Sequence, residues 1–173
     1  MPAHESFWDY SCRVYARPGV STLCLHLQNE HGQDVNLLLF AAWFGQTRGA
    51  LTDPELQRAL TFSQTWADKV VRPLRGARSW LKEKTEGLTP LTDLERDGMQ
   101  ELRTQIKALE LRTEHYQQTR LEAMVISPLR IQTHEEGLDA MFANLQRMTS
   151  ANAEPSPVLQ ESLSALCSAL ASA

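Results

Sequence analysis

The sequence predicts an all-α protein, a single-domain bundle of about seven to nine helices, on three observations. Apolar residues recur every three or four positions through most of the 173 residues. The Thr-x-x-Glu capping box, which begins a helix, occurs at Thr52, Thr92 and Thr133. Residues 35–44 are apolar on almost every side. We expect this stretch to be the central helix on which the others pack.

Two short helices are expected before the central one. Ser6 can cap the first, which ends at Pro18 and Gly19. The second ends at Gly32, since glycine suits the left-handed conformation that closes many helices. For residues 35–44 a buried strand is the alternative, because a short apolar run has no diagnostic period. The leucine and alanine content favours a helix.

The middle of the chain predicts long helices. The helix that begins at Thr52 should be interrupted at Pro73, because proline lacks an amide proton and collides with the preceding turn. It continues to about Lys84. Thr92 opens the longest helix, about 92–126, and Thr133 opens the next. The long helix has one seam whose members advance by three or four residues, formed by Met99, Leu102, Ile106, Leu109, Thr113, Tyr116, Arg120 and Met124.

The domain organisation is expected to be simple. Residues 1–149 form one helical domain, and residues 150–157 are small, polar and proline-bearing, as is typical of a linker. Residues 158–173 form a C-terminal helix whose narrow seam needs a covering surface. We expect it to dock on the same domain; swapping between copies or binding a partner are the alternatives. The seam consists of Leu159, Leu163, Leu166 and Leu170.

Charge and composition exclude several classes of protein. The chain has 17 Lys and Arg against 21 Asp and Glu, a net charge of −4. Its overall charge therefore does not attract it to nucleic acid or to an anionic membrane. No apolar run approaches the roughly 18 residues that span a bilayer, and the N-terminus does not resemble a secretion signal. The three cysteines are widely spaced, so no disulfide is expected. These features predict a cytoplasmic protein.

A row of basic residues is the first candidate site. Residues 69–84 hold six Lys and Arg against one Glu. Arg72, Arg75, Arg78 and Lys82 share one face of a continuous helix, where guanidinium groups could bind a phosphate, a carboxylate or an acidic partner helix. If so, replacing Arg75 and Arg78 by Gln should leave folding nearly intact and weaken ligand binding. The alternative is a solvated basic face paired with acidic residues elsewhere, for example those in 93–101.

A lone amide in the central helix is the second candidate. Asn36 shares a face with Phe40 and Trp43, and one polar group between aromatic rings is a plausible lining for a small-molecule pocket. The alternative is an internal hydrogen bond to the backbone of another helix, since a buried amide without a partner costs about 1–3 kcal/mol.

Several segments together resemble a known family. They are Phe7-Trp8 with Tyr15, Gly19-Val20, Cys24-Leu25, Leu27-Gln28, Gly32, Asp34-Val35-Asn36-Leu37-Leu38-Leu39-Phe40 with Trp43, Trp66, Val70, Pro73-Leu74-Arg75 and Arg78. In these residues, between about Phe7 and Met124, the chain resembles a small family of uncharacterised proteobacterial proteins. The resemblance implies a bacterial, cytoplasmic, helical protein and supplies no mechanism or catalytic residue.

The sequence favours binding over catalysis. It has no metal-binding His and Glu spacing, no nucleophile elbow and no glycine-rich phosphate loop, so no catalytic residue, metal or cofactor is expected. The leading interpretation is a non-catalytic protein-binding or adaptor module, with another protein as partner and no membrane. The alternative is a binding or enzymatic pocket for an anionic small molecule; a nucleic-acid role for Lys69–Lys84 ranks lower. A homodimer could form through the long helix or the C-terminal helix.

Overall fold

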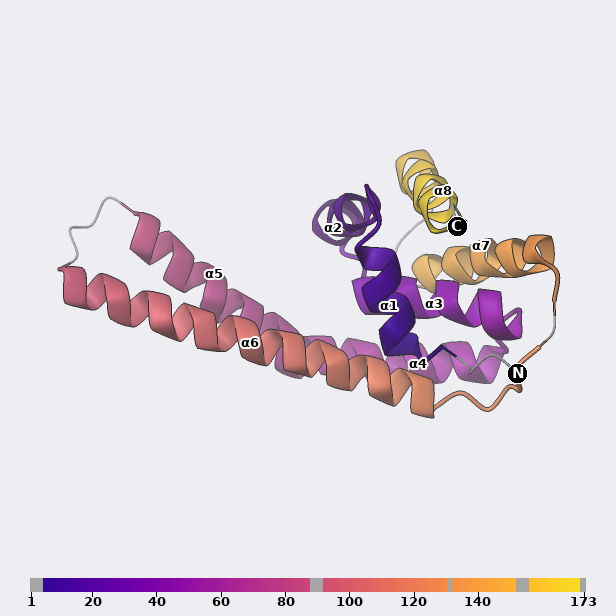
Figure 1. The fold of residues 1–173 in the computed structure, drawn as a ribbon, viewed down its shortest axis with the longest axis horizontal. Coiled ribbons are helices and arrows are strands. Elements are labelled where there is room, and N and C mark those ends of the chain that lie inside the picture. The colour runs from indigo at the N-terminus through magenta and orange to yellow at the C-terminus, as the bar shows by residue number, and fades with distance from the viewer. Residues whose placement is uncertain (1–4, 88–91, 131, 152–155, 172–173) are drawn as a thin grey trace. The chain divides into compact units, whose positions relative to one another are not determined.

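The computed structural model describes residues 5–87, 92–130, 132–151 and 156–171 (Figure 1). These residues form eight α-helices and one π-helical turn and contain no strand, which confirms the predicted all-α class. None of their helices is both long and apolar enough to cross a membrane. In chain order the elements are α1 (Phe7–Tyr15), α2 (Val20–His31), α3 (Val35–Arg48), α4 (Asp53–Trp66), η1 (Ala67–Val71), α5 (Arg72–Glu86), α6 (Asp93–Ala123), α7 (His134–Ser150) and α8 (Pro157–Ala171).

The chain divides into two compact units. The first, called here the core unit, comprises the residues up to Thr61 and those from Gln118 onward. The second, the hairpin unit, is the continuous segment Phe62–Gln117. The sequence pattern carries no sign of this division, because α4 and α6 run through the two boundaries without a glycine, a proline or a polar linker.

Helix α3 is the centre of the core unit. Asp34 caps it by accepting hydrogen bonds from the backbone N–H groups of Asn36 (2.8 Å) and Leu37 (3.4 Å). All ten side-chain positions from Asn36 to Gly45 are buried, and α3 contacts α1, α2 and α7. The central helix predicted at 35–44 is therefore present, and the strand alternative is wrong. The helix extends past that range to Arg48.

The closest packing in the core unit is between α3 and α7. At Gly45 a Cβ atom would overlap the backbone of Met141, so only glycine lets the two helices approach this closely. One turn further along α7, the fully buried Asn144 accepts a hydrogen bond from the N–H of Leu51 (2.8 Å) and donates one to the carbonyl oxygen of Gly49 (3.0 Å). This amide satisfies the backbone where the chain leaves α3.

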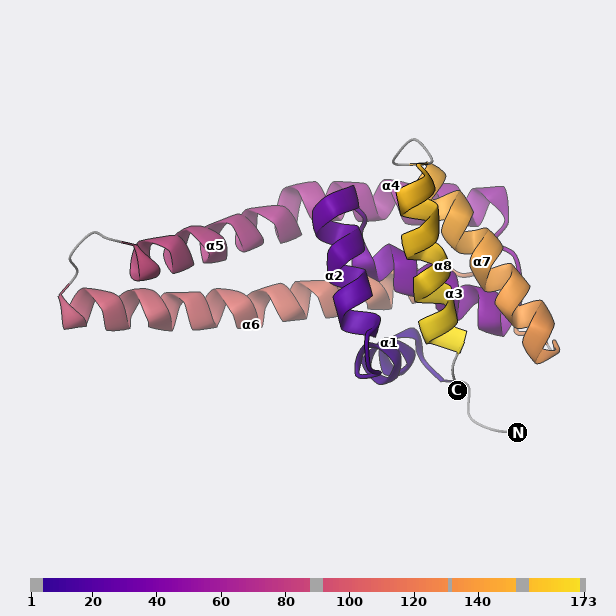
Figure 2. The same cartoon turned by 90° about the horizontal axis from the view of Figure 1, so that it is seen from above.

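Helix α8 packs on the core unit, against α2 and α7 (Figure 2). Its end is fixed by Arg17, whose Nη1 donates a hydrogen bond to the carbonyl oxygen of Leu170 at 2.9 Å. Residues 152–155 of the predicted linker and residues 172–173 lie outside the described residues. The four seam leucines are buried inside the chain, so they offer no surface to a partner: Leu159, Leu163, Leu166 and Leu170.

All three predicted capping boxes form. In each, the threonine hydroxyl accepts from the backbone N–H of the glutamate, and the glutamate carboxylate accepts from the threonine N–H. The second box begins α6, which spans 31 residues, so the predicted long helix is confirmed. The pairs are Thr52 with Glu55, Thr92 with Glu95, and Thr133 with Glu136.

Candidate interaction surface

The hairpin unit is built from two helices that run antiparallel, α5 and α6, which lie side by side in both views (Figures 1 and 2). Near Trp66 the indole Nε1 donates to the carbonyl oxygen of Thr113 at 3.1 Å, and the indole ring packs 4.9 Å from the ring of Tyr116. Further along, Arg96 donates to the carbonyl oxygen of Thr85 at 3.1 Å. The end of α4 contacts late α6, and late α5 contacts early α6, so the chain runs antiparallel to α6 along this unit.

Pro73 determines how the chain enters α5. The interruption expected there takes the form of the π-helical turn η1, in which the N–H of Arg72 bonds to the carbonyl oxygen of Ala67. Proline has no N–H to offer the carbonyl group four residues earlier, and the wider turn accommodates that loss. Pro73 itself lies in the first turn of α5, where a missing N–H costs little.

The predicted basic row is divided by its ion pairs. Arg75 and Arg78 turn toward α6 and share the buried carboxylate of Glu110, with Arg75 Nε at 3.4 Å from Oε1. Arg75 also reaches Glu114 at 3.3 Å. These acidic partners lie 32 to 39 residues away in sequence and are not the ones in 93–101 that the charge pattern suggested. Two guanidinium groups thus join α5 to α6.

The other two residues of the row face solvent. Arg72 pairs with Asp68 of η1, and Lys82 lies 3.8 Å from Glu86 of α5, each four residues away along the chain. Exposed pairs of this kind contribute little to stability. All four predicted site cations therefore have a carboxylate partner within the chain, and binding of an external anion at Arg72, Arg75, Arg78 and Lys82 stays a prediction.

The predicted pocket residues lie in the core unit. The side-chain oxygen of Asn36 accepts a hydrogen bond from Gln118 Nε2 at 2.7 Å, so the amide has an internal partner in the side chain of Gln118. The ring of Phe7 packs against Phe40 and Trp43, at 5.5 and 5.4 Å between centroids. Aromatic packing thus occupies space beside these two rings, and ligand binding at Asn36, Phe40 and Trp43 stays a prediction.

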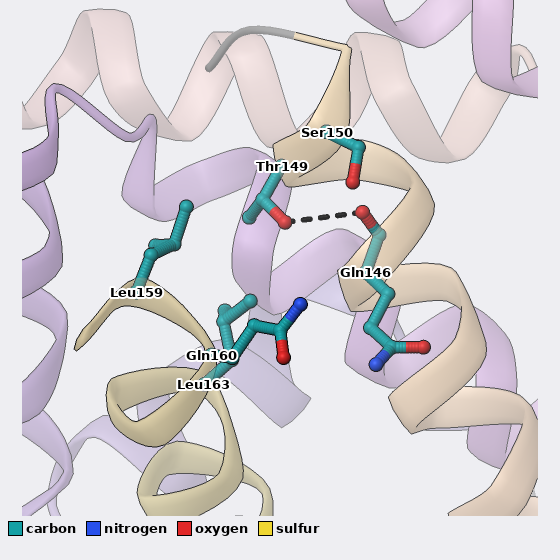
Figure 3. Close-up of a pocket in the computed structure, with 6 residues that line it drawn as sticks. All are labelled: Gln146, Thr149, Ser150, Leu159, Gln160 and Leu163. Carbon is teal, nitrogen blue, oxygen red and sulfur yellow. Dashed lines mark hydrogen bonds between the residues drawn. The ribbon is translucent and has the colours of Figure 1, made fainter. Parts of the chain in front are cut away.

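A separate hollow lies between α7 and α8 (Figure 3). Its volume is about 240 Å³, and one of its polar groups is already engaged, because Thr149 Oγ1 donates to the carbonyl oxygen of Gln146 at 3.1 Å. None of the six described lining residues is charged, so this hollow does not suit an anionic ligand. The sequence analysis named two of them, Leu159 and Leu163, as members of the apolar seam and did not predict a pocket there; the full lining is Gln146, Thr149, Ser150, Leu159, Gln160 and Leu163.

The long seam of α6 is only half covered. Every second member of the heptad pattern is partly shielded within the hairpin unit: Met99, Ile106 and Thr113. The alternate members Leu102, Leu109 and Tyr116 are 52%, 43% and 48% exposed. Because they are spaced by seven residues, they form one line of about 21 Å along the helix. We call Leu102, Leu109 and Tyr116 the α6 stripe.

The α6 stripe and the ion pairs lie on different sides of α6. A helix turns by about 100° per residue, so Glu114 lies about 40° to one side of Glu110 and Leu109 lies about 100° to the other. Leu111, which is 58% exposed, lies about 100° around the helix from Glu110 on the side of Glu114. The arginines therefore lie along one edge of the hairpin, and the α6 stripe lies along the other, where its side chains stay about half exposed.

One known protein family matches the region of the chain that contains the α6 stripe. A family model described as "Protein of unknown function (DUF2390)" matches residues 6–121. The chain belongs to this family. The DUF2390 match includes α1 to α5, the whole α6 stripe and α6 up to residue 121, and it stops before α7 and α8. It confirms the resemblance to an uncharacterised family. No curated protein and no solved structure matches the chain.

Proposed function

We propose that this protein is a non-catalytic protein-binding module, an adaptor, whose hairpin unit binds a helix of a partner along the α6 stripe. The observation that carries the proposal is the exposure of Leu102, Leu109 and Tyr116 in one line. A single exposed leucine needs no explanation, since apolar atoms cover much of any protein surface. Three large apolar side chains at heptad spacing form the seam that a second helix requires.

The size of the stripe indicates how strong such binding could be. Fully burying one large apolar side chain against a partner stabilises the complex by roughly 1.5–3 kcal/mol. Each of these side chains is about half buried already. Together they would contribute about 2–5 kcal/mol, part of which offsets the loss of motional freedom on association. A stable complex therefore also needs contacts from the residues that flank the stripe.

The test compares the proteins that are captured by variants altered on the α6 stripe with those captured by a variant altered on another face of α6. Tagged wild-type protein, the double variant Leu102→Gln/Leu109→Gln and the control Leu111→Gln are each incubated with lysate of the source organism. We expect the wild type and the control to retain a common partner and the double variant to lose it. Capture that is equal for all three would contradict the proposal, provided that circular dichroism shows equal helicity.

We propose the bacterial cytoplasm as the place where the module acts. This rests on the resemblance of the segments Phe7-Trp8 and Asp34–Phe40 to proteobacterial sequences. Fractionation of cells that carry a tagged genomic copy would test it, and recovery of the protein outside the cytoplasmic fraction would contradict it.

A further inference from the structure

We infer that the helix bound by the α6 stripe is α6 of a second copy of this chain, in antiparallel orientation, so that two hairpin units form a four-helix bundle. The inference rests on the proposed function and names the occupant of the same surface. Two properties of α6 argue for a second copy: the distribution of its charges and the symmetry of its stripe.

The charges of α6 are separated by sign along the helix. Its first nine residues carry four exposed carboxylates against one arginine, whereas residues 102–117 carry three basic side chains. The two glutamates of that second part are neutralised by Arg75 and Arg78. The acidic set is Asp93, Glu95, Asp97 and Glu101, opposed by Arg96, and the basic set is Arg103, Lys107 and Arg112. Of these side chains, Glu101 and Arg112 lie on one flank of the stripe, and an antiparallel second copy with its axis at Leu109 brings the Glu101 of one copy toward the Arg112 of the other. A parallel copy in register would instead set each of them against its own kind.

The stripe is also self-complementary. With equal spacing of seven residues on either side of Leu109, a twofold axis at Leu109 places Leu102 of one copy opposite Tyr116 of the other. A patch that meets itself in this way closes as a dimer and does not propagate into a filament.

The same axis predicts one specific ion pair. Glu101 and Arg112 are eleven residues apart, about three turns, so they lie on the same flank of α6. In the antiparallel register Glu101 of one copy lies about 7–8 Å along the axis from Arg112 of the other, a distance that the long arginine side chain can span.

The first test is sedimentation equilibrium of the full chain over a range of concentrations. We expect the wild type to be a dimer. Leu109→Glu places two carboxylates at the twofold axis and should weaken dimerisation at least about tenfold, while Leu111→Glu, on the opposite side of α6, should leave it unchanged. Circular dichroism on each variant separates loss of association from loss of fold.

The second test concerns orientation and pairing. Glu101→Arg and Arg112→Glu should each weaken self-association, and an equimolar mixture of the two should restore it, because both cross-pairs are then of opposite charge. In a Cys12→Ser background, which removes the exposed native thiol, Leu102→Cys should cross-link to Tyr116→Cys and neither variant to itself. Cross-links of each variant to itself alone would contradict the antiparallel arrangement.

The outcomes separate this inference from the proposed function. A wild type that is monomeric at all concentrations, or a dimer that Leu109→Glu leaves intact, would overturn the second copy as occupant. A monomer that still captures another protein through the α6 stripe would overturn only the dimer and support the binding function. Variants of the stripe that alter neither self-association nor capture would overturn both.

Discussion

At Gly45 a single absent methyl group sets the distance between α3 and α7. Taken alone, the sequence places a glycine near the end of an apolar helix, where it is usually a terminator. The structure places it inside α3, against the backbone of Met141 on a helix that begins almost ninety residues later. No local pattern reveals such a crossing, because helix propensity depends on near neighbours and interhelical distance depends on remote ones.

This position gives a matched pair of substitutions. Gly45→Ala should destabilise the protein by about 1–3 kcal/mol, because the new Cβ forces α3 and α7 apart and outweighs the gain in helix propensity. Gly76→Ala in α5, where nothing lies within 4 Å of the added atom, should stabilise by about 0.5–1 kcal/mol. Urea unfolding of the two variants measures both, and a stabilised Gly45→Ala would refute the close crossing.

The residues of the candidate site show the same division between local and remote information. The exposed pair of Arg72 with Asp68 could be predicted, since residues four apart meet on any helix. The partner of Arg78 could not, because Glu110 becomes a neighbour only when α6 folds back along α5. For the same reason the lone amide of Asn36 indicated that a partner exists without identifying Gln118.

At the scale of the element, Glu55 performs two tasks. It completes the capping box of α4 with Thr52, and its carboxylate also accepts from the backbone N–H groups of Ile126 (3.3 Å) and Ser127 (3.0 Å), just beyond the end of α6. Burial raises the pKa of Glu55, but the hydrogen bonds from Thr52 and Ser127 outweigh it and leave the pKa below its ordinary value. The charged form therefore ties the start of α4 to the chain after α6.

This coupling predicts a pH dependence. The folded-state pKa of Glu55 is depressed, so its ionised carboxylate adds to the free energy of unfolding. This contribution is fully present above the unfolded-state pKa near 4.5 and is lost as the pH falls through the folded-state pKa. Glu55→Gln should lower the free energy of unfolding by about 2 kcal/mol at neutral pH. It should also make the free energy of unfolding depend less on pH in the acid range. Glu135→Gln, at an exposed carboxyl outside any capping box, is the control. Parallel acid limbs for wild type and Glu55→Gln would contradict this role.

The elements themselves were largely predictable. Each capping box reports its own helix start through contacts that span three residues, and Gly32 adopts the expected left-handed conformation with φ of 63°. The two faces of α6 were not, because a heptad seam is the same in a sequence whether α5 covers all of it or, as here, alternate positions only.

At the scale of the whole molecule, the two units differ in how much they bury. The core unit holds most of the buried apolar side chains, including the whole of α3 from Leu37 to Phe44. In the hairpin unit, the described apolar side chains that are buried are Val71 and Leu81. Local unfolding requires less free energy where fewer apolar groups are packed. The hairpin unit should therefore open without the core unit.

Native-state hydrogen exchange measures this difference. We expect the amides of α5 and of residues 93–110 to exchange at a lower opening free energy than those of α3, and their protection to rise with protein concentration if the hairpins dimerise. Uniform protection over both units would contradict independent opening. The sequence did not indicate this division, since hydrophobic periodicity continues through Thr61 and Gln118 alike.

The carboxylate shared by Arg75 and Arg78 changes how experiments on the basic row must be designed. Replacing both arginines by Gln strands the buried charge of Glu110, and an uncompensated buried charge is far more costly than the loss of two surface cations. Such a variant would loosen the hairpin and abolish binding of any kind, whatever the arginines touch. A triple replacement that also converts Glu110 to Gln removes the confounding charge and gives the mutational study a sound baseline.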